Sequence, residues 1–130
     1  MKHKDIEQEL LLSLIEDVIY SGGENNFAII GLNREYYIQI AAGKGDYEVY
    51  CEAVSNHYLE EEYYLTEDQI QQLATLNWQS PEDSEGNYFL VHPVDSEGSR
   101  TNLADLLLTT SKSVYDAQNL TEKDISLNLE

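Results

Sequence analysis

Three consecutive stretches of strand-forming residues, joined by short turns, exclude most folds for this chain. Residues 27–32, 36–42 and 46–54 are rich in β-branched residues and tyrosine, which favour β-strands. The connections at 33–34 and 43–46 are short and contain asparagine or glycine, as hairpin turns do. The pattern therefore predicts a three-stranded antiparallel meander.

The second and third stretches alternate in polarity, which indicates a sheet with one buried face and one solvated face. In the third stretch the apolar series alternates with Glu48, Tyr50 and Glu52. The residues expected to face the core are Tyr36, Ile38 and Ile40 in the second stretch and Tyr47, Val49, Cys51 and Ala53 in the third.

Helices are predicted before and after the meander. Apolar residues recur at steps of three and four between positions 5 and 20, which is helical spacing. Thr66 is expected to cap a second helix that ends near Asn77, with Gln69 completing a capping box. A third helix is predicted from a cap at Asn102 to about residue 118.

One further strand is predicted at 87–94, between the second and third helices. Pro93 lies in it, and proline lacks the N–H group that a central strand needs, so this strand is expected to lie at an edge of the sheet or to end at Pro93. Residues 125–129 alternate again between apolar and polar, which fits either an added strand or a frayed end. The predicted class is α+β, in the order α-β-β-β-α-β-α with an antiparallel sheet covered by helices.

The net charge of the chain restricts the classes of partner that it is expected to bind. The 130 residues include 25 acidic and 7 basic side chains, spread evenly, for a net charge of −18. Such a surface repels nucleic-acid phosphates and anionic lipids and attracts basic partners.

We expect a single domain over 1–130, with its core at about 5–118 and a tail at 119–130. No stretch is apolar enough to span a bilayer, and we expect a cytoplasmic protein.

No pattern typical of catalysis, metal binding or cofactor binding is present. Cys51 stands in the predicted apolar series with no base beside it, which favours a buried, unreactive thiol. The spacing of His3, His57 and His92 matches no metal site. Asp83, Glu85 and Asn87 resemble the start of a calcium loop, but its glycine and its final glutamate are missing. We therefore expect a protein that is not an enzyme and that uses no cofactor or metal.

Ten tyrosines are the remaining unusual feature. Tyrosine gains contact area at protein interfaces with little loss of side-chain entropy, and it also packs well in sheets. Both roles stay open for the tyrosines of the meander. The candidate partner-binding residues are Tyr36, Tyr37, Tyr47 and Tyr50.

Two local motifs resemble those of a known family. The third strand ends in Val54-Ser55-Asn56, and Leu73 to Pro81 contains Asn77-Trp78. These stretches are similar to the YbjN-like or TY-Chap relatives of type III secretion chaperones, in which a strand ends in Val-Ser-Asn-x-Tyr/Phe-Leu and Leu-Gly-Trp-x-x-Pro closes a helix. Asn77 replaces the glycine of that pattern. The signature residues, expected to have structural roles, are Ser55, Asn56, Tyr58, Leu59 and Trp78.

The resemblance implies a type III secretion chaperone-like fold and a non-enzymatic module that holds a protein or peptide segment on a sheet edge or in an apolar groove. It also implies a homodimer, which the tyrosine-rich strands and the alternating tail favour as well. The charge of −18 supports an alternative, an acidic immunity or decoy protein that neutralises a basic toxin or nucleic-acid enzyme.

Overall fold

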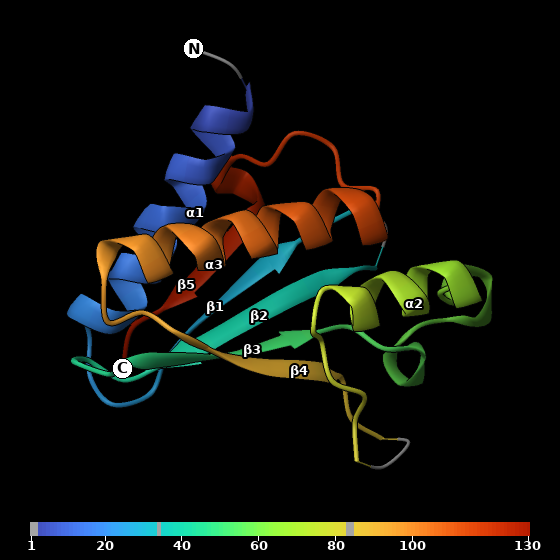
Figure 1. Ribbon diagram of the computed structural model, residues 1–130, viewed down its shortest axis with the longest axis horizontal. Helices are drawn as coiled ribbons and strands as arrows, with labels where there is room; N and C mark the ends of the chain where they lie inside the picture. The colour runs from blue at the N-terminus through green and yellow to red at the C-terminus, as the bar shows by residue number, and fades with distance from the viewer. Residues whose placement is uncertain (1–2, 34, 83–84) are drawn as a thin grey trace.

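The structure is a computed structural model that describes residues 3–33, 35–82 and 85–130. Its element order confirms the predicted order and adds a C-terminal strand (Figure 1). The main helices are α1 (His3–Tyr20), α2 (Glu67–Thr75) and α3 (Glu97–Thr109), and the strands are β1 (Asn26–Gly31), β2 (Tyr37–Ala42), β3 (Glu48–Ala53), β4 (Tyr88–Pro93) and β5 (Ile125–Asn128).

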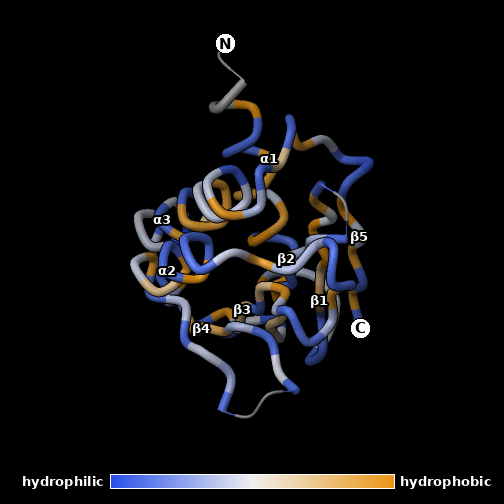
Figure 2. The backbone as a smooth tube through the Cα atoms, turned by 90° about the vertical axis from the view of Figure 1, so that its right-hand side faces the viewer, coloured by the Kyte–Doolittle hydropathy of each residue, from blue (hydrophilic) through white to orange (hydrophobic). Residues whose placement is uncertain are grey.

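The five strands form one antiparallel sheet in the order β4-β3-β2-β1-β5. All three helices lie over the same side of this sheet (Figures 1 and 2). Ala28, Ile40, Cys51 and Leu90 stand opposite one another on four neighbouring strands, and all four are buried. The core therefore lies between the sheet and the helices, and no α-helix of the described residues lies on the other side of the sheet.

The predicted turn and cap signals around α2 are confirmed. The Thr66 hydroxyl accepts a hydrogen bond from the Gln69 N–H, and the Gln69 side chain accepts one from the Thr66 N–H. Asn77 ends the helix with a φ of 73°, in the left-handed region that asparagine tolerates better than other residues with a β-carbon. This explains why asparagine can replace the glycine of the family pattern.

The predicted cap of the third helix is wrong. The N-cap is Ser96, whose hydroxyl accepts from the Ser99 N–H, so α3 begins at Glu97, well before the predicted cap at Asn102. The α-helix also ends earlier than predicted, and a π-helical segment follows at Thr110–Val114. There the Thr110 and Ser111 hydroxyls donate to the carbonyls of Leu106 and Leu107, a type of bond that bends helices.

Two positions in the sheet decide further predictions. Tyr47, which is predicted to face the core, lies just before β3 and is 75% exposed, so that prediction is wrong. The alternating tail forms a strand, because β5 pairs with β1. Asn26 holds the end of that strand, since its side-chain oxygen accepts from the Glu130 N–H at 2.9 Å.

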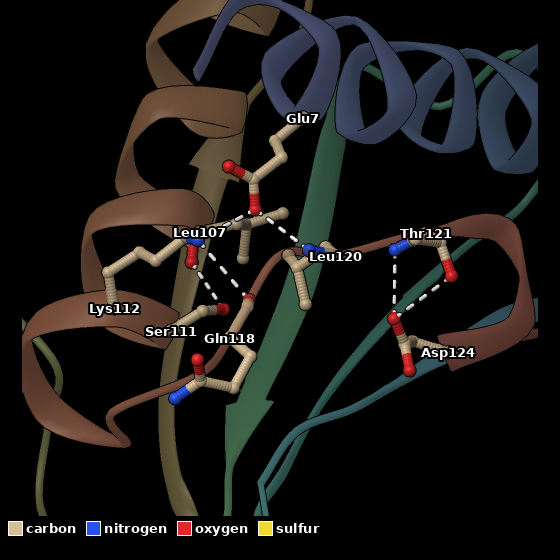
Figure 3. Close-up of polar contacts among 8 residues, drawn as sticks. All are labelled: Glu7, Leu107, Ser111, Lys112, Gln118, Leu120, Thr121 and Asp124. Carbon is tan, nitrogen blue, oxygen red and sulfur yellow. Dashed lines mark hydrogen bonds and ion pairs between the residues drawn. The ribbon is translucent and has the colours of Figure 1, made fainter. Parts of the chain in front are cut away.

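An ion pair between a buried carboxylate and a partly exposed lysine positions the segment that leads to β5 (Figure 3). Glu7 on α1 is 4% exposed. Its Oε2 atom lies 2.8 Å from the Lys112 Nζ and accepts a hydrogen bond from the Leu120 N–H at 2.8 Å. Lys112 also donates to the Gln118 carbonyl. One carboxylate thus joins α1, the π-helical segment and the chain that enters β5.

The buried thiol of Cys51 gives a prediction for alkaline pH. Burial raises its pKa from 9.0 to about 12. The unfolded thiol loses its proton near pH 9 while the folded one keeps it, so the folded state loses stability as the pH rises from 9 towards 12. Urea unfolding is expected to show, between pH 10 and 11, a decline steeper by about 1 kcal/mol per pH unit in the natural protein than in Cys51→Ala. Parallel declines would contradict this.

Candidate functional site

The side of the sheet opposite the helices, called the open face here, is covered by none of the three α-helices (Figure 1). The β-strand alternation directs onto it the residues that are out of phase with the core. Its residues are Phe27 and Ile29 of β1, Tyr37, Gln39 and Ala41 of β2, Glu48, Tyr50 and Glu52 of β3, and Phe89 and Val91 of β4.

An apolar strip crosses the open face from β1 to β4. Phe27, Ala41, Tyr50 and Val91 stand opposite one another in the register of the sheet. Val91 is 52% exposed and Tyr50 is 42% exposed. The apolar strip consists of Phe27, Ile29, Ala41, Tyr50, Phe89 and Val91. The other four residues are half-buried. Neighbouring apolar residues that keep exposed surface mark binding sites more often than scattered ones do.

Two hollows lie on the open face, one near each end of the strip. The first, called the β3–β4 hollow, has a volume of about 340 Å³. The second, called the β1–β2 hollow, has a similar volume of about 340 Å³ and includes Phe27, Glu24 and Asp46. The β3–β4 hollow is lined by Tyr50, Glu52, Pro81, Glu82, Gly86, Asn87 and Phe89.

The β3–β4 hollow has an aromatic side and an acidic side. The rings of Tyr50 and Phe89 are nearly parallel, with centroids 6.4 Å apart and planes inclined by 20°. Asn87 donates to the Glu52 carboxylate at 3.4 Å and to the Tyr37 hydroxyl at 3.1 Å. Partial burial, and secondly the negative charge of Glu52, raise the pKa of Tyr50. Tyr50 is therefore neutral at physiological pH, and the Glu52 carboxylate lies close enough for its charge to influence the pKa of the Tyr50 hydroxyl.

The two edges of the sheet differ. On β4, Phe89 exchanges both backbone hydrogen bonds with Gln79, and Pro93 has no N–H. Of the outward-facing residues of β4, only Val91 keeps both a donor and an acceptor for another strand. On β5, Glu130 is bonded to Asn25 of the β1 side, so the alternation turns the N–H and C=O groups of Leu127 and Leu129 outward. The edge at β5 is therefore the more open one.

The four predicted partner-binding tyrosines lie in different places. Tyr36 is buried, and its hydroxyl donates to the Tyr63 carbonyl. Tyr37 is half-buried on the open face, and Tyr47 is exposed at the start of β3. Only Tyr50 belongs to the apolar strip and lines a hollow. The four do not form one surface.

The signature residues make contacts within the chain. Ser55 donates to the Gly86 carbonyl at 2.8 Å, and Tyr58 donates to the Glu85 carbonyl at 2.6 Å. The Asn56 side chain accepts from the Leu65 N–H. Leu59 and Trp78 are buried. Ser55 and Tyr58 thus hold the segment 85–87, which forms one wall of the β3–β4 hollow.

Most of the apolar strip was not identified from the sequence. The sequence pattern predicts the two strands but assigns no binding role to four of their residues, Phe27, Ile29, Phe89 and Val91. The available signal was that β1 and β4 carry apolar residues at successive positions, so that both faces of these strands are apolar. This pattern fits a sheet covered on both sides, yet one side of this sheet has no cover within the chain described.

Among the described residues, no group of three or more histidine, cysteine, aspartate or glutamate side chains could hold a metal ion. No helix of the described chain is both long and apolar enough to cross a membrane.

Comparison with known proteins agrees with this architecture. A family model, TY-Chap3, described as "T3SS (YopN, CesT) and YbjN peptide-binding chaperone 3", matches residues 13–122. The chain belongs to the TY-Chap3 family. Its three helices and five-stranded open sheet are consistent with the type III secretion chaperone fold. No curated protein and no solved structure shows a significant match to the chain.

The match places most of the open face inside the TY-Chap3 domain. It covers β1 to β4 completely, whereas β5 begins at Ile125, beyond its last residue. The strip and both hollows are built from residues 24–91 and therefore lie within the matched region. The open edge at β5 lies outside it.

Proposed function

We propose that this TY-Chap3 protein is a non-enzymatic, chaperone-like module that holds a segment of a partner protein against its open face. The observation that carries this proposal is the apolar strip, which crosses four strands and is covered by nothing in the described chain. The family description, peptide-binding chaperone, supports the same function. A cytoplasmic location remains a prediction.

The charge of the protein suits a chaperone that exposes apolar surface. Like charges keep copies of a protein apart in solution, and this chain carries a net charge of −18. On the open face Glu48 and Glu52 alternate with Tyr50 along β3. The strip thus stays accessible to a partner while the acids oppose self-association through that face.

Selection of peptides from a random 12-residue phage library, followed by fluorescence anisotropy with one selected peptide, tests the proposal. Replacing Tyr50 with serine is expected to weaken binding about five- to tenfold, because truncation of a central aromatic contact costs more than about 1 kcal/mol. Tyr64→Ser is the matched control, since Tyr64 is 49% exposed and lies outside the open face. Equal losses in both variants, or no selected peptide, would count against the proposal.

The net charge of −18 favours a second candidate, an acidic immunity or decoy protein. Binding of that kind depends on long-range attraction to a basic partner and weakens steeply with salt. Apolar binding on the strip depends less on salt. The affinity for a captured partner at 50 and 500 mM NaCl distinguishes the two functions.

We also propose that a homodimer, if formed, pairs through β5. Leu127 and Leu129 are each 40% exposed and turn their backbone groups outward. The β4 edge has fewer free backbone groups for another strand, because Gln79 already pairs with Phe89 and Pro93 has no N–H. Sedimentation at high protein concentration, compared with Leu127→Pro, tests this assembly.

A further inference from the structure

The β3–β4 hollow has a composition that an apolar peptide alone would not need. The rings of Tyr50 and Phe89, inclined by only 20° to each other, line it. Glu52 and Glu82 also line it, and none of the described lysine or arginine residues does. An aliphatic side chain placed there would remove water from carboxylates without replacing its hydrogen bonds, which costs free energy.

A planar cation fits both parts of this lining. Aromatic faces attract cations, and the arginine guanidinium in particular stacks on aromatic rings. The same group donates paired hydrogen bonds to carboxylates. A lysine ammonium is more strongly hydrated and cannot stack in this way.

We propose that the β3–β4 hollow binds the guanidinium group of an arginine in the partner segment, stacked on Tyr50 and Phe89 and facing Glu52 and Glu82. This inference rests on the proposed function and names the chemistry of the partner: an apolar segment that carries arginine. The wall of the hollow supports it, because Ser55 and Asn87 are joined by a hydrogen bond of 3.0 Å that fixes the segment 85–87 beside Glu52.

The β1–β2 hollow provides a comparison within the same molecule. It has a similar volume and includes the acids Glu24 and Asp46, but Phe27 is its only aromatic residue. In each hollow one carboxylate already accepts a hydrogen bond: Asp46 from the Gly43 N–H at 2.6 Å, and Glu52 from the Asn87 side chain at 3.4 Å. If acidity alone attracted cations, both hollows would respond equally to an added cation.

Two-dimensional NMR of the whole chain, titrated with L-arginine amide, L-lysine amide and L-citrulline amide, tests this inference. Arginine amide is expected to give saturable shifts at the amides of Gly86, Asn87 and Phe89. Citrulline amide has a side chain of nearly the same shape and the same α-amino group but no side-chain charge, so it is expected to give much smaller shifts there. Lysine amide is expected to bind about two- to fivefold more weakly, as the loss of stacking at an exposed site implies.

Variants complete the test. Glu52→Gln, with Glu82→Gln as a second variant should the first disturb the fold, is expected to weaken arginine amide binding about two- to fivefold. Glu61→Gln, an exposed acid outside the hollow, is expected to change nothing. Equal shifts in both hollows, equal binding of lysine and arginine, or a loss with Glu61→Gln as large as with Glu52→Gln would overturn the inference.

This experiment can fail separately from the proposed function. If selected phage peptides bind the open face but arginine amide does not bind the hollow, the peptide-binding function stands and the arginine site is wrong. If arginine amide binds the hollow and no peptide binds the face, the arginine site stands as a feature of the structure and the proposed function is wrong.

Discussion

Replacing Trp78 with alanine is expected to lower the free energy of unfolding by about 3–5 kcal/mol, the usual cost of removing a large aromatic side chain from a core. Trp78 is 3% exposed, and it lies just after α2, next to the helix end made by Asn77. Its Nε1–H donates to the Thr110 hydroxyl at 3.0 Å. The indole thus joins the end of α2 to the start of the π-helical segment. Urea unfolding followed by far-UV circular dichroism measures the loss.

Trp78→Phe separates packing from hydrogen bonding. It keeps most of the apolar contact and removes the N–H group, so the expected loss is about 1–2 kcal/mol. Tyr64→Ala, at a residue 49% exposed, is expected to change stability by no more than about 0.5 kcal/mol. A loss for Trp78→Ala as small as that of Tyr64→Ala would show that the indole does not join the two helical segments.

Glu7→Ala is expected to cost about 2 kcal/mol. The substitution leaves the buried N–H of Leu120 without its acceptor and removes the ion pair with Lys112. Loss of a buried ion-pair partner costs more in a dry interior, but Lys112 is 33% exposed, so water moderates the effect. The expected result includes faster hydrogen exchange at Ser126 and Asn128 of β5, because Glu7 anchors the chain entering that strand.

Two variants define what Glu7 contributes. Glu7→Gln keeps an oxygen for the Leu120 N–H and loses only the charge, so it is expected to cost about half as much as Glu7→Ala. Glu9→Ala changes an exposed acid on the same helix and is expected to cost no more than about 0.5 kcal/mol. If hydrogen exchange in β5 were unaffected by Glu7→Ala, Glu7 would not anchor that strand.

The elements most fully predicted from the sequence are those set by local chemistry. The meander, the capping box of Thr66 and Gln69, and the edge position of the strand with Pro93 all follow from a few neighbouring residues. The start of α3 was missed because its capping box uses Ser96 and Ser99 in place of the more common glutamate or glutamine.

The candidate site depends on contacts that no local pattern contains. The β3–β4 hollow forms only because Pro81 and Asn87 line the same hollow as Tyr50 of β3. The ion pair with Lys112 and the hydrogen bond from the Leu120 N–H both join Glu7 to residues more than 100 positions away in the sequence. Tyrosine content indicates the meander in general, but only the register of β3 and β4 brings the ring of Tyr50, which pairs with Val91, beside the ring of Phe89. The register of a sheet depends on contacts between residues far apart in the sequence, so local sequence patterns do not determine it.

The unequal edges of the sheet limit how copies of this protein can assemble. An endless fibril of stacked sheets requires two free edges on every molecule, so that each copy both offers and accepts a strand. Here Gln79 and Pro93 restrict one edge, while the other is open at Leu127 and Leu129. Two copies that join open edge to open edge close on themselves. Growth then stops at the pair, which protects a protein with an exposed apolar strip from polymerising through its backbone.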